Sequence, residues 1–479
     1  MEFGVHLRER VYNGTEIWCE VFKLRILKRK RPLNPAEILV FGFGGMIVIG
    51  TILLCLPAAS STGESVGFLS AFFSATSAVC VTGLSVLEIG TAFSLFGQMV
   101  MLILIQLGGI GFMTATSMVY MLIGRRITLK DRIVIKDSLG ETHLQGVVRM
   151  TRSVLIVTAA AEAAGILLLS LRFIPEYGAA RGFYYSVFHS ISSFCNAGFD
   201  VFGLGNSLVS YAYDPLVTIT IMSLITVGGL GFFVVVELYR KTLLGHKYHL
   251  KLHTKIVLIT SGVLVLAGFL FFLAFEWNNP RTLGAEGLST GDKVLGAMFQ
   301  SVTPRTAGYA TIPQGDLMPA SKIATTALMF IGASPSGTGG GIKTTTAVML
   351  LFLVATIVTG KKDTVVMKRR MSKDVMMRAI TIATIAFVFV GFITMLLCIV
   401  EQSHLAASDL LFETVSAFAT VGLSTGITHA LSPMSQILII ITMFAGRVGV
   451  FTVSMAVAKR MSKQDVSNIR YPEERVMIG

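Results

Sequence analysis

Four short segments of the sequence combine small side chains, hydroxyl groups and a glycine, and each lies between apolar runs. They are Val81-Thr82-Gly83, Asn196-Ala197-Gly198, Thr306-Ala307-Gly308 and Thr420-Val421-Gly422. Glycine adopts a positive φ without a steric penalty, so consecutive carbonyl groups can turn toward a common axis. Rings of backbone carbonyls replace the hydration shell of the ion in channel selectivity filters. The segments therefore predict a binding site for a monovalent cation that is built from backbone oxygen atoms.

Other metal or catalytic chemistry is not indicated by the side chains. No aspartate or glutamate lies within the four segments, so they lack the ring of carboxylates that a pore selective for divalent ions would use. The five cysteines are scattered without a CxxC pair, which gives no zinc site and no disulfide framework. We expect no covalently bound cofactor and no enzymatic activity.

The four segments recur with a fixed period. Their glycines are separated by about 110 to 115 residues, which indicates internal repetition. Before each segment lies an apolar run of about a dozen residues, too short to span a bilayer, that we interpret as a re-entrant helix. These runs cover residues 68–79, 183–194, 291–302 and 410–418. A hydroxyl side chain follows a phenylalanine of each run by four residues: Phe73 and Ser77, Phe188 and Ser192, Phe299 and Thr303, Phe412 and Ser416.

The direction of the re-entrant helices favours cations. If these helices enter from outside, their carboxyl ends, each carrying about half a negative charge, point at the centre of the assembly. Asp292, Asp409 and Glu413 are expected near the outward amino ends, which is the favourable position for acids.

The composition is that of a membrane protein. The chain has 479 residues, of which 53% are hydrophobic and only 14% are charged, whereas soluble domains carry about 25% charged residues. Eight apolar runs are long enough to cross about 30 Å of hydrocarbon. They cover residues 38–56, 98–123, 154–171, 216–238, 256–275, 323–358 with an internal break, 380–400 and 437–458.

The net charge of +13 is concentrated in alternate loops. Basic clusters lie at residues 23–31, 125–152, 240–255 and 361–373 and after residue 459. Loops rich in lysine and arginine stay in the cytoplasm, so both termini are predicted to be cytoplasmic, and the intervening loops, such as residues 172–181, to face outward. Membrane topology accounts for the basic residues, and we expect no nucleic-acid partner. Every repeat then begins and ends in the cytoplasm, unlike the inverted repeats of many secondary transporters.

The predicted fold is an all-α membrane protein with eight transmembrane helices and four re-entrant pore helices, arranged as four parallel helix–pore-loop–helix repeats around a pseudo-fourfold pore. A basic cytoplasmic arm covers residues 1–33, and repeat 1 covers residues 34–124. Cytoplasmic linkers with repeats 2, 3 and 4 cover residues 125–239, 240–358 and 359–460, and a cytoplasmic tail covers residues 461–479.

A glycine-rich segment interrupts the sixth apolar run. Each interior glycine costs a helix about 1 kcal/mol relative to alanine, and a loop at membrane depth is tolerated only where it is buried or lines a water-filled path. We interpret the segment as a gate, with a simple kink between packed helices as the alternative. The predicted gate residues are Gly332, Ala333, Ser334, Pro335, Ser336, Gly337, Thr338, Gly339, Gly340, Gly341 and Lys343. A phosphate-binding G-x-x-x-x-G-K-[ST] loop is disfavoured, since Ile342 precedes the lysine and no strand precedes the segment.

Arg447 places a charge at membrane depth, which costs about 2.5 kcal/mol or more unless the charge is paired or faces water. We predict that Arg447 is a gate charge that lies below the glycine segments, opposes the passage of cations and donates hydrogen bonds to carbonyls of residues 332–341. Lys343 is expected to act similarly. A salt bridge with Glu162 or Glu237 is the alternative for Arg447.

The stretches "TSAVCVTGLS", "FHSISSFCNAGFD", "FQSVTPRTAGY" and "ASPSGTGGGIKTTT" resemble the Trk/Ktr/HKT superfamily of potassium transporters, and within it the Ktr-type bacterial membrane subunit. The resemblance extends from about residue 32 onward, with Tyr309 where another aromatic residue, often Phe, follows the third glycine. It implies K+ bound by the filter carbonyls, a homodimer in the bilayer of the bacterial plasma membrane, and a cytoplasmic ring of RCK-type regulatory subunits. Nucleotides are expected on that partner only, and sodium dependence is common in the family.

These features together predict potassium uptake through a gated, channel-like pore driven by the membrane potential. A potential of about 100 mV is worth roughly 2.3 kcal/mol per charge, enough to concentrate a cation about fiftyfold. A sodium- or proton-coupled potassium symporter with alternating access is the alternative. An ATPase would require the chain itself to bind nucleotide through Lys343.

Overall fold

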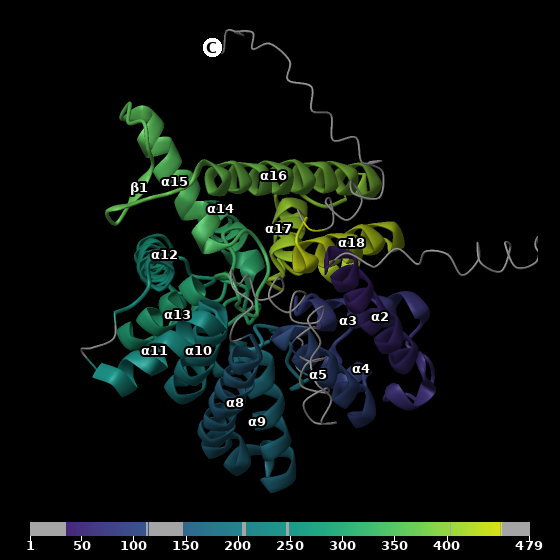
Figure 1. Ribbon diagram of the computed structural model, residues 1–479. Helices are drawn as coiled ribbons and strands as arrows, with labels where there is room; N and C mark the ends of the chain where they lie inside the picture. The colour runs from purple at the N-terminus through teal and green to yellow at the C-terminus, as the bar shows by residue number, and fades with distance from the viewer. Residues whose placement is uncertain are drawn as a thin grey trace, which may run out of the picture.

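The computed structural model describes residues 35–111, 114, 147–203, 207–245, 249–402, 404–450 and 452. The predicted amino-terminal arm, the carboxyl-terminal tail and most of the basic cluster at residues 125–152 lie outside these residues. The described part consists of helices, connecting segments and a two-stranded antiparallel hairpin, β1 (Val365–Val366) with β2 (Arg369–Arg370). Figure 1 shows the helices in groups that follow one another in chain order around a central region, where the connecting segments meet.

Each group contains a long helix, a shorter helix and an exit helix. The long helices are α2 (Pro35–Cys55), α8 (Val147–Tyr177), α12 (Leu252–Glu276) and α16 (Lys373–Glu401). The shorter helices, which match the predicted re-entrant runs closely, are α3 (Phe68–Cys80), α9 (Ala179–Phe194), α13 (Thr290–Val302) and α17 (Ala407–Ala419). The exit helices are α5 (Leu95–Ile110), α10 (Pro215–Leu230), α14 (Pro319–Phe330) and α18 (Pro433–Val448). Two further helices follow exit helices, α11 (Phe232–Leu244) and α15 (Thr344–Val358).

Short helical turns join these elements. They are η1 (Pro57–Ala59), α4 (Ile89–Ala92), η2 (Val209–Tyr211), η4 (Gln314–Asp316) and η5 (Thr428–Ala430). The last four stand immediately before the four exit helices. Three of the exit helices begin at a residue whose polar side chain caps the helix. In α10 this residue is Asp214, whose carboxylate accepts hydrogen bonds from the amides of Leu216 and Val217 at 3.0 and 3.2 Å.

Helix length and composition are those of a multi-pass membrane protein. Among the described residues, four helical stretches are long and apolar enough to span a bilayer, or five if the bent pair α10 and α11 forms one span. The four stretches are Glu37–Cys55, Met150–Tyr177, Leu252–Glu276 and Lys373–Glu401. They expose large apolar side chains such as Leu167 (70%) and Phe387 (73%), a surface that suits lipid.

One predicted span is not continuous. Residues 216–238 form α10 and α11, which are bent by 102° at Gly231. Gly231 has a φ of 91°, and a Cβ there would collide with the carbonyl oxygen of Pro335. The amide of Phe232 instead donates to the carbonyl of Ser336 at 3.0 Å. The apolar pattern could not reveal this break, because its cause is a contact with a segment a hundred residues away. The exit helices α5 and α18 likewise end before glycines of positive φ, Gly111 and Gly449.

A predicted outward loop is largely helical. Residues 172–181 were expected to form a loop, but α8 continues through Pro175 to Tyr177, and α9 begins at Ala179. The last turns of α8 are stabilised by Arg172, which pairs with Glu176 at 3.0 Å and with Asp214 at 2.6 Å. The chain reverses at a single residue, Gly178, whose φ is 82°.

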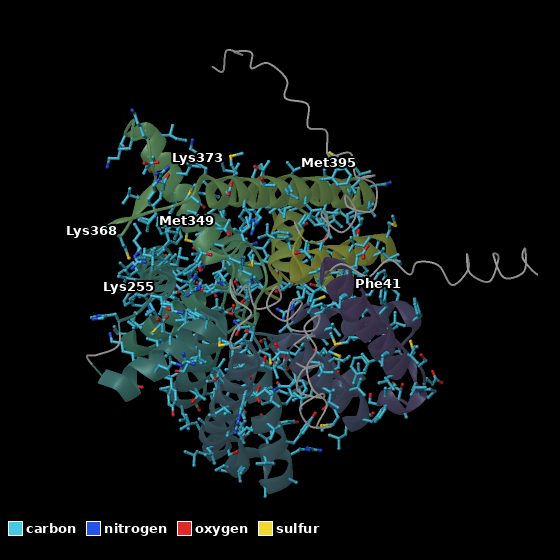
Figure 2. All side chains as sticks on the ribbon, viewed as in Figure 1. Phe41, Lys255, Met349, Lys368, Lys373 and Met395 are labelled. Atoms are coloured by element: carbon cyan, nitrogen blue, oxygen red, sulfur yellow. The ribbon has the colours of Figure 1, made fainter. Side chains whose placement is uncertain are left out.

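The beginnings of α12 and α16 lie at the same end of the molecule. Ile256 of α12, Met349 of α15, Val366 of β1 and Met376 of α16 belong to one buried apolar cluster. Figure 2 shows Lys255, Lys368 and Lys373 around this cluster. Two of the four long helices therefore begin at the same apolar cluster, next to basic side chains.

Candidate functional site

The four glycine segments meet in a closed ring. A Cβ built on each glycine would lie less than 3.0 Å from the carbonyl oxygen that precedes the next glycine in the ring. The pairs are Gly83 with Ala197, Gly198 with Ala307, Gly308 with Val421, and Gly422 with Thr82. The last pair returns to the first segment, so the four copies surround one centre. We call Gly83, Gly198, Gly308 and Gly422, with these carbonyls, the glycine ring.

The backbone conformation repeats in all four copies. The glycines have φ values of 92°, 69°, 79° and 93°, and two residues before each glycine stands another left-handed residue. These residues are Val81 (57°), Asn196 (61°), Thr306 (67°) and Thr420 (50°). Left-handed φ is costly for β-branched side chains, and such strain persists only where the surroundings impose it. Strained backbone of this kind is concentrated at functional sites.

The hydroxyl side chains that recur four residues after a phenylalanine anchor the ring. Ser77 accepts a hydrogen bond from Thr82 N through its carbonyl at 2.8 Å and from Gly83 N through its hydroxyl at 3.1 Å. Ser416 repeats both contacts, with Val421 N at 2.8 Å and Gly422 N at 3.1 Å.

The other two hydroxyls reach residues just beyond the glycine. Ser192 exchanges hydrogen bonds with the backbone of Phe199 at 2.9 and 3.1 Å, and Thr303 donates to the carbonyl of Tyr309. The Tyr309 hydroxyl donates to the Phe199 carbonyl at 2.8 Å. A tyrosine at this position therefore ties the third copy to the second.

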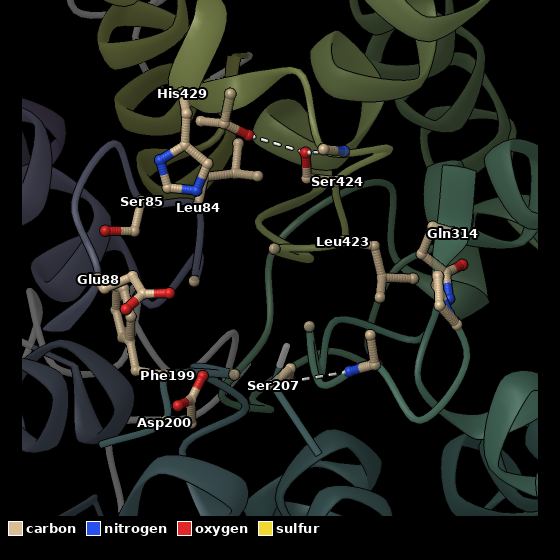
Figure 3. Close-up of a pocket in the computed structure, with 18 of the residues that line it drawn as sticks. Leu84, Ser85, Glu88, Phe199, Asp200, Ser207, Gln314, Leu423, Ser424 and His429 are labelled. Carbon is tan, nitrogen blue, oxygen red and sulfur yellow. Dashed lines mark hydrogen bonds between the residues drawn. The ribbon is translucent and has the colours of Figure 1, made fainter. Parts of the chain in front are cut away.

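All four glycines line one cavity of about 500 Å³, the ring cavity. Its titratable lining residues are Glu88, Asp200, Asp316 and His429, with no lysine or arginine among the described residues that line it. Figure 3 shows Glu88, Asp200 and His429 around the open centre. Burial raises the pKa of Asp200 to about 6, and the Glu88 carboxylate adds to this effect. The negative side chains make this cavity attractive to cations.

The acids predicted at the helix amino ends are placed differently from one another. Asp292 closes a capping box with Ser289 at the start of α13, and Asp409 in the first turn of α17 pairs with Lys322 at 3.3 Å. Glu413 is not near the end of α17. It lies in the middle of that helix and is fully buried, and its carboxylate accepts hydrogen bonds from Ser424 and Thr428.

The predicted gate segment packs directly against the glycine ring on the side of the left-handed residues. The amide of Gly340 donates to the Thr420 hydroxyl at 2.9 Å, and a Cβ on Gly339 would collide with the Thr306 hydroxyl. Residues 331–343 form a loop between α14 and α15, closed by a bridge between Ile331 and Ile342.

The loop is also bonded to α10. Ser334 N and Thr338 N donate to the carbonyls of Gly229 and Gly228 at 3.0 and 3.2 Å. Thr344 closes the loop base through a hydroxyl contact with Ser334 at 3.0 Å. A simple kink would be held only by the two helices that flank it. This segment instead makes hydrogen bonds or close contacts with residues of repeats 2, 3 and 4.

Arg447 is bonded to backbone rather than to an acid. Its guanidinium donates to the carbonyls of Thr338 in the loop and Gly108 in α5. The alternative partners are engaged elsewhere: Glu162 accepts from Gln106 at 3.2 Å, and Glu237 accepts from Lys251 N at 2.8 Å and from Thr254. The expected contact with the loop is therefore present. The contact with Gly108 could not be predicted from the sequence, because every residue has a backbone carbonyl that can accept a hydrogen bond.

Lys343 bonds within its own loop. Its ammonium group donates to the carbonyl of Gly339 at 2.7 Å. Lys343 and Arg447 both line a second cavity of about 340 Å³, the loop cavity, together with Gly339, Gly341 and Phe43. Two positive side chains thus line a cavity on the loop side, while acids line the ring cavity.

Comparisons with known proteins agree with this architecture. The TrkH family model, described as a cation transport protein, matches residues 35–469. The chain is 37% identical over 459 residues to the Ktr system potassium uptake protein B of Bacillus subtilis, covering 95% of this chain and 99% of that protein. It is 36% identical over 470 residues to the potassium/sodium uptake protein NtpJ of Enterococcus hirae, covering 96% and 100%. The crystal structure of the potassium transporter TrkH from Vibrio parahaemolyticus has a similar fold, with a TM-score of 0.70, 16% identity and coverage of 89% of this chain and 86% of that one.

Proposed function

This chain belongs to the TrkH family of cation transport proteins, and we propose that it takes up potassium ions through a gated, channel-like pore in the bacterial plasma membrane. The family predicted from the sequence is thereby confirmed, and the chain is a transporter rather than an enzyme. Potassium as the cargo is supported by the names of relatives that match nearly the whole chain, a potassium uptake protein and a potassium/sodium uptake protein.

The observation that carries the proposal is the closed glycine ring. Each glycine faces the carbonyl of the next copy, and each copy holds a left-handed residue at the same position. Four peptide segments in this arrangement supply the oxygen atoms that a dehydrated potassium ion requires. The filter is formed by the four predicted segments, Val81–Gly83, Asn196–Gly198, Thr306–Gly308 and Thr420–Gly422.

The proposed membrane arrangement has eight spans and four re-entrant helices in four parallel repeats. Four long helices have the length of a span, and the shorter helices α3, α9, α13 and α17 end at the glycine ring. The basic residues beside the starts of α12 and α16 fit the cytoplasmic side. The ring cavity then faces outward, the loop cavity faces the cytoplasm, and both termini are cytoplasmic.

The loop of residues 331–343 is the gate in this proposal. It lies against Thr306 and Thr420 and is held by Arg447, so it obstructs the path directly below the filter. Opening requires the loop to leave Arg447 and the ring. The positive charges of Arg447 and Lys343 add an electrostatic barrier in the closed state.

Two partners complete the proposal. The names of relatives assign them to a Ktr system, which supports a second subunit, and we propose a cytoplasmic ring of RCK-type subunits that binds nucleotide and pulls the gate open. The membrane subunit is proposed to be a homodimer. The membrane potential alone supplies enough energy for uptake, and we propose that uptake depends on sodium, as the name of the Enterococcus relative suggests.

Rubidium uptake tests the function in cells that lack their own potassium systems, with and without the regulatory subunit. We expect uptake to exceed that of empty-vector cells and to rise with the regulator. In proteoliposomes, the reversal potential should follow the potassium gradient. Uptake with a fixed stoichiometry to sodium or protons and no potassium current would instead establish the coupled symporter.

A further inference from the structure

A buried polar side chain occupies the same position in each short helix. Each short helix contains a phenylalanine that is followed four residues later by a hydroxyl side chain. The residue directly after this phenylalanine is polar, although its position is completely buried. The four residues are Ser74, His189, Gln300 and Glu413, each with 0% exposure. Burying a polar group is unfavourable unless it is hydrogen-bonded, so the partners of these side chains indicate what the position does.

Glu413 connects its helix to the segment beyond the fourth glycine. Its Oε1 atom accepts hydrogen bonds from the hydroxyls of Ser424 and Thr428, the latter at 2.6 Å. These hydroxyls also contact each other at 2.9 Å. Oε2 has no hydrogen-bond partner among the described residues. An amide at this position could therefore retain both contacts through its own oxygen.

Gln300 makes the same kind of connection in the third repeat. Its amide nitrogen donates to Gln314 Oε1 at 2.8 Å, and Gln314 Nε2 donates back to Gln300 Oε1 at 3.0 Å. Gln314 also donates to the carbonyl of Ile312 at 2.7 Å. Both partners are buried, at 0% and 2% exposure, so the reciprocal pair is shielded from water.

The first two repeats differ. The His189 ring stacks on Phe202, with centroids 4.1 Å apart and planes at 20°, and its Nδ1 lies 2.8 Å from the Tyr185 carbonyl oxygen. The hydroxyl of Ser74 has no partner among the described residues. The connection therefore runs through hydrogen bonds in repeats 3 and 4 and through a ring contact in repeat 2.

The partners of Gln300 and Glu413 form the wall of the ring cavity. Gln314, Ser424 and Thr428 line this cavity together with the four glycines of the ring. Figure 3 shows Gln314 and Ser424 on its wall. The buried side chains thus fix the wall from behind, without touching the ion path.

We propose that Gln300 and Glu413 are positioning residues for ion selection, because they hold the segments beyond Gly308 and Gly422 against their short helices. The inference rests on the proposed potassium function. A filter distinguishes potassium from sodium only if its oxygen atoms keep their spacing or number around the ion. Loss of a buried connection lets these segments move inward or outward, which admits the smaller ion.

The test measures the ratio of potassium to sodium permeability in proteoliposomes for variants of the full chain. Glu413→Leu and Gln300→Leu should each lower the ratio about tenfold, the effect of losing a buried hydrogen-bond connection. Glu413→Gln should retain the wild-type ratio, since its Oε1 can accept from both hydroxyls. Ser74→Ala is the matched control at the equivalent position and should also retain it.

A double substitution separates positioning from stability. Replacing both Gln300 and Gln314 by leucine removes the Gln314 amide whose oxygen loses its donor in Gln300→Leu, at the cost of the single bond to the Ile312 carbonyl. We expect the thermal stability of this double variant to be no lower than that of Gln300→Leu. Its permeability ratio should nevertheless remain low, because the connection is still absent.

Three outcomes would contradict part of this account. If the wild-type protein does not prefer potassium over sodium, the proposed function fails. Suppose that the wild type and Ser74→Ala prefer potassium over sodium. If Glu413→Leu and both variants that replace Gln300 have the same permeability ratio as the wild type, the proposed function stands and the positioning role is wrong. A reduced amount of protein with an unchanged ratio would also contradict the positioning role.

Discussion

Arg447 and Thr338, which are 109 residues apart, are joined by a hydrogen bond from the guanidinium Nη1 to the carbonyl oxygen. The second branch of the same guanidinium reaches Gly108 in α5. Thr338 N in turn donates to Gly228 of α10 at 3.2 Å. One arginine therefore joins the loop to two exit helices.

Arg447→Ala should increase basal potassium flux without changing ion preference. The substitution removes two hydrogen bonds from a charged donor, each worth about 1.5 to 3 kcal/mol. We expect a rise in flux of roughly tenfold or more in the absence of the regulatory subunit, measured as rubidium uptake into proteoliposomes. Arg447→Lys, which keeps the charge but not both contacts, should give an intermediate flux. Unchanged basal flux in both variants would show that Arg447 does not hold the gate.

Gly308→Ser should reduce the preference for potassium over sodium by roughly tenfold or more, because a Cβ there meets the carbonyl of Val421 and must displace it. Gly63→Ser provides a matched control. Gly63 also has a positive φ, of 77°, but nothing lies within 4 Å of its added Cβ. Reversal potentials under mixed potassium and sodium gradients report the change. Equal loss of preference in both variants would argue against a special role for the ring.

Lys343→Ala should leave nucleotide binding by the isolated chain at the background level of the wild type. The ammonium group is bonded to the Gly339 carbonyl within its own loop, at 2.7 Å. Removing this single contact should raise basal flux by less than Arg447→Ala does. Calorimetry with ATP on the purified chain checks the first expectation. Saturable binding that is lost in Lys343→Ala would revive the ATPase interpretation.

External acid should slow uptake. Asp200 carries a negative charge at the ring cavity above its pKa of about 6 and loses the charge as the pH falls through this value. Loss of one charge at the entrance lowers the local cation concentration, and we expect uptake at subsaturating potassium to fall by about twofold to fivefold between pH 7.5 and pH 5. Asp200→Asn should be slow at both pH values. If the variant keeps the full pH dependence, Asp200 is not the group that causes it.

The sequence predicted those features that depend on local pattern. The short helices followed from the apolar runs. The spacing of Phe73 and Ser77 marked a hydroxyl shared by the repeats, but its bond with Gly83 N was not predicted. The interruption between α14 and α15 followed from glycine and proline content. In each case the residues that determine the local structure lie within a few positions of it in the sequence.

Features that depend on distant partners were not predicted. At Gly231 the bend places the chain against Pro335, and the buried Glu413 is hydrogen-bonded by hydroxyls in the segment beyond the fourth glycine. The predicted helix began at residue 410, which put Glu413 in its first turn. An acid there is usually explained by the helix dipole, so the local pattern indicated an exposed end. The contact between Arg447 and the loop was predicted only because a charge at membrane depth requires a partner.

Crystals soaked in rubidium provide the most direct test of the glycine ring as an ion site. The account predicts anomalous scattering peaks on the axis enclosed by Gly83, Gly198, Gly308 and Gly422, and weaker peaks when sodium competes. Anomalous density elsewhere, with none inside the ring at saturating rubidium, would contradict it.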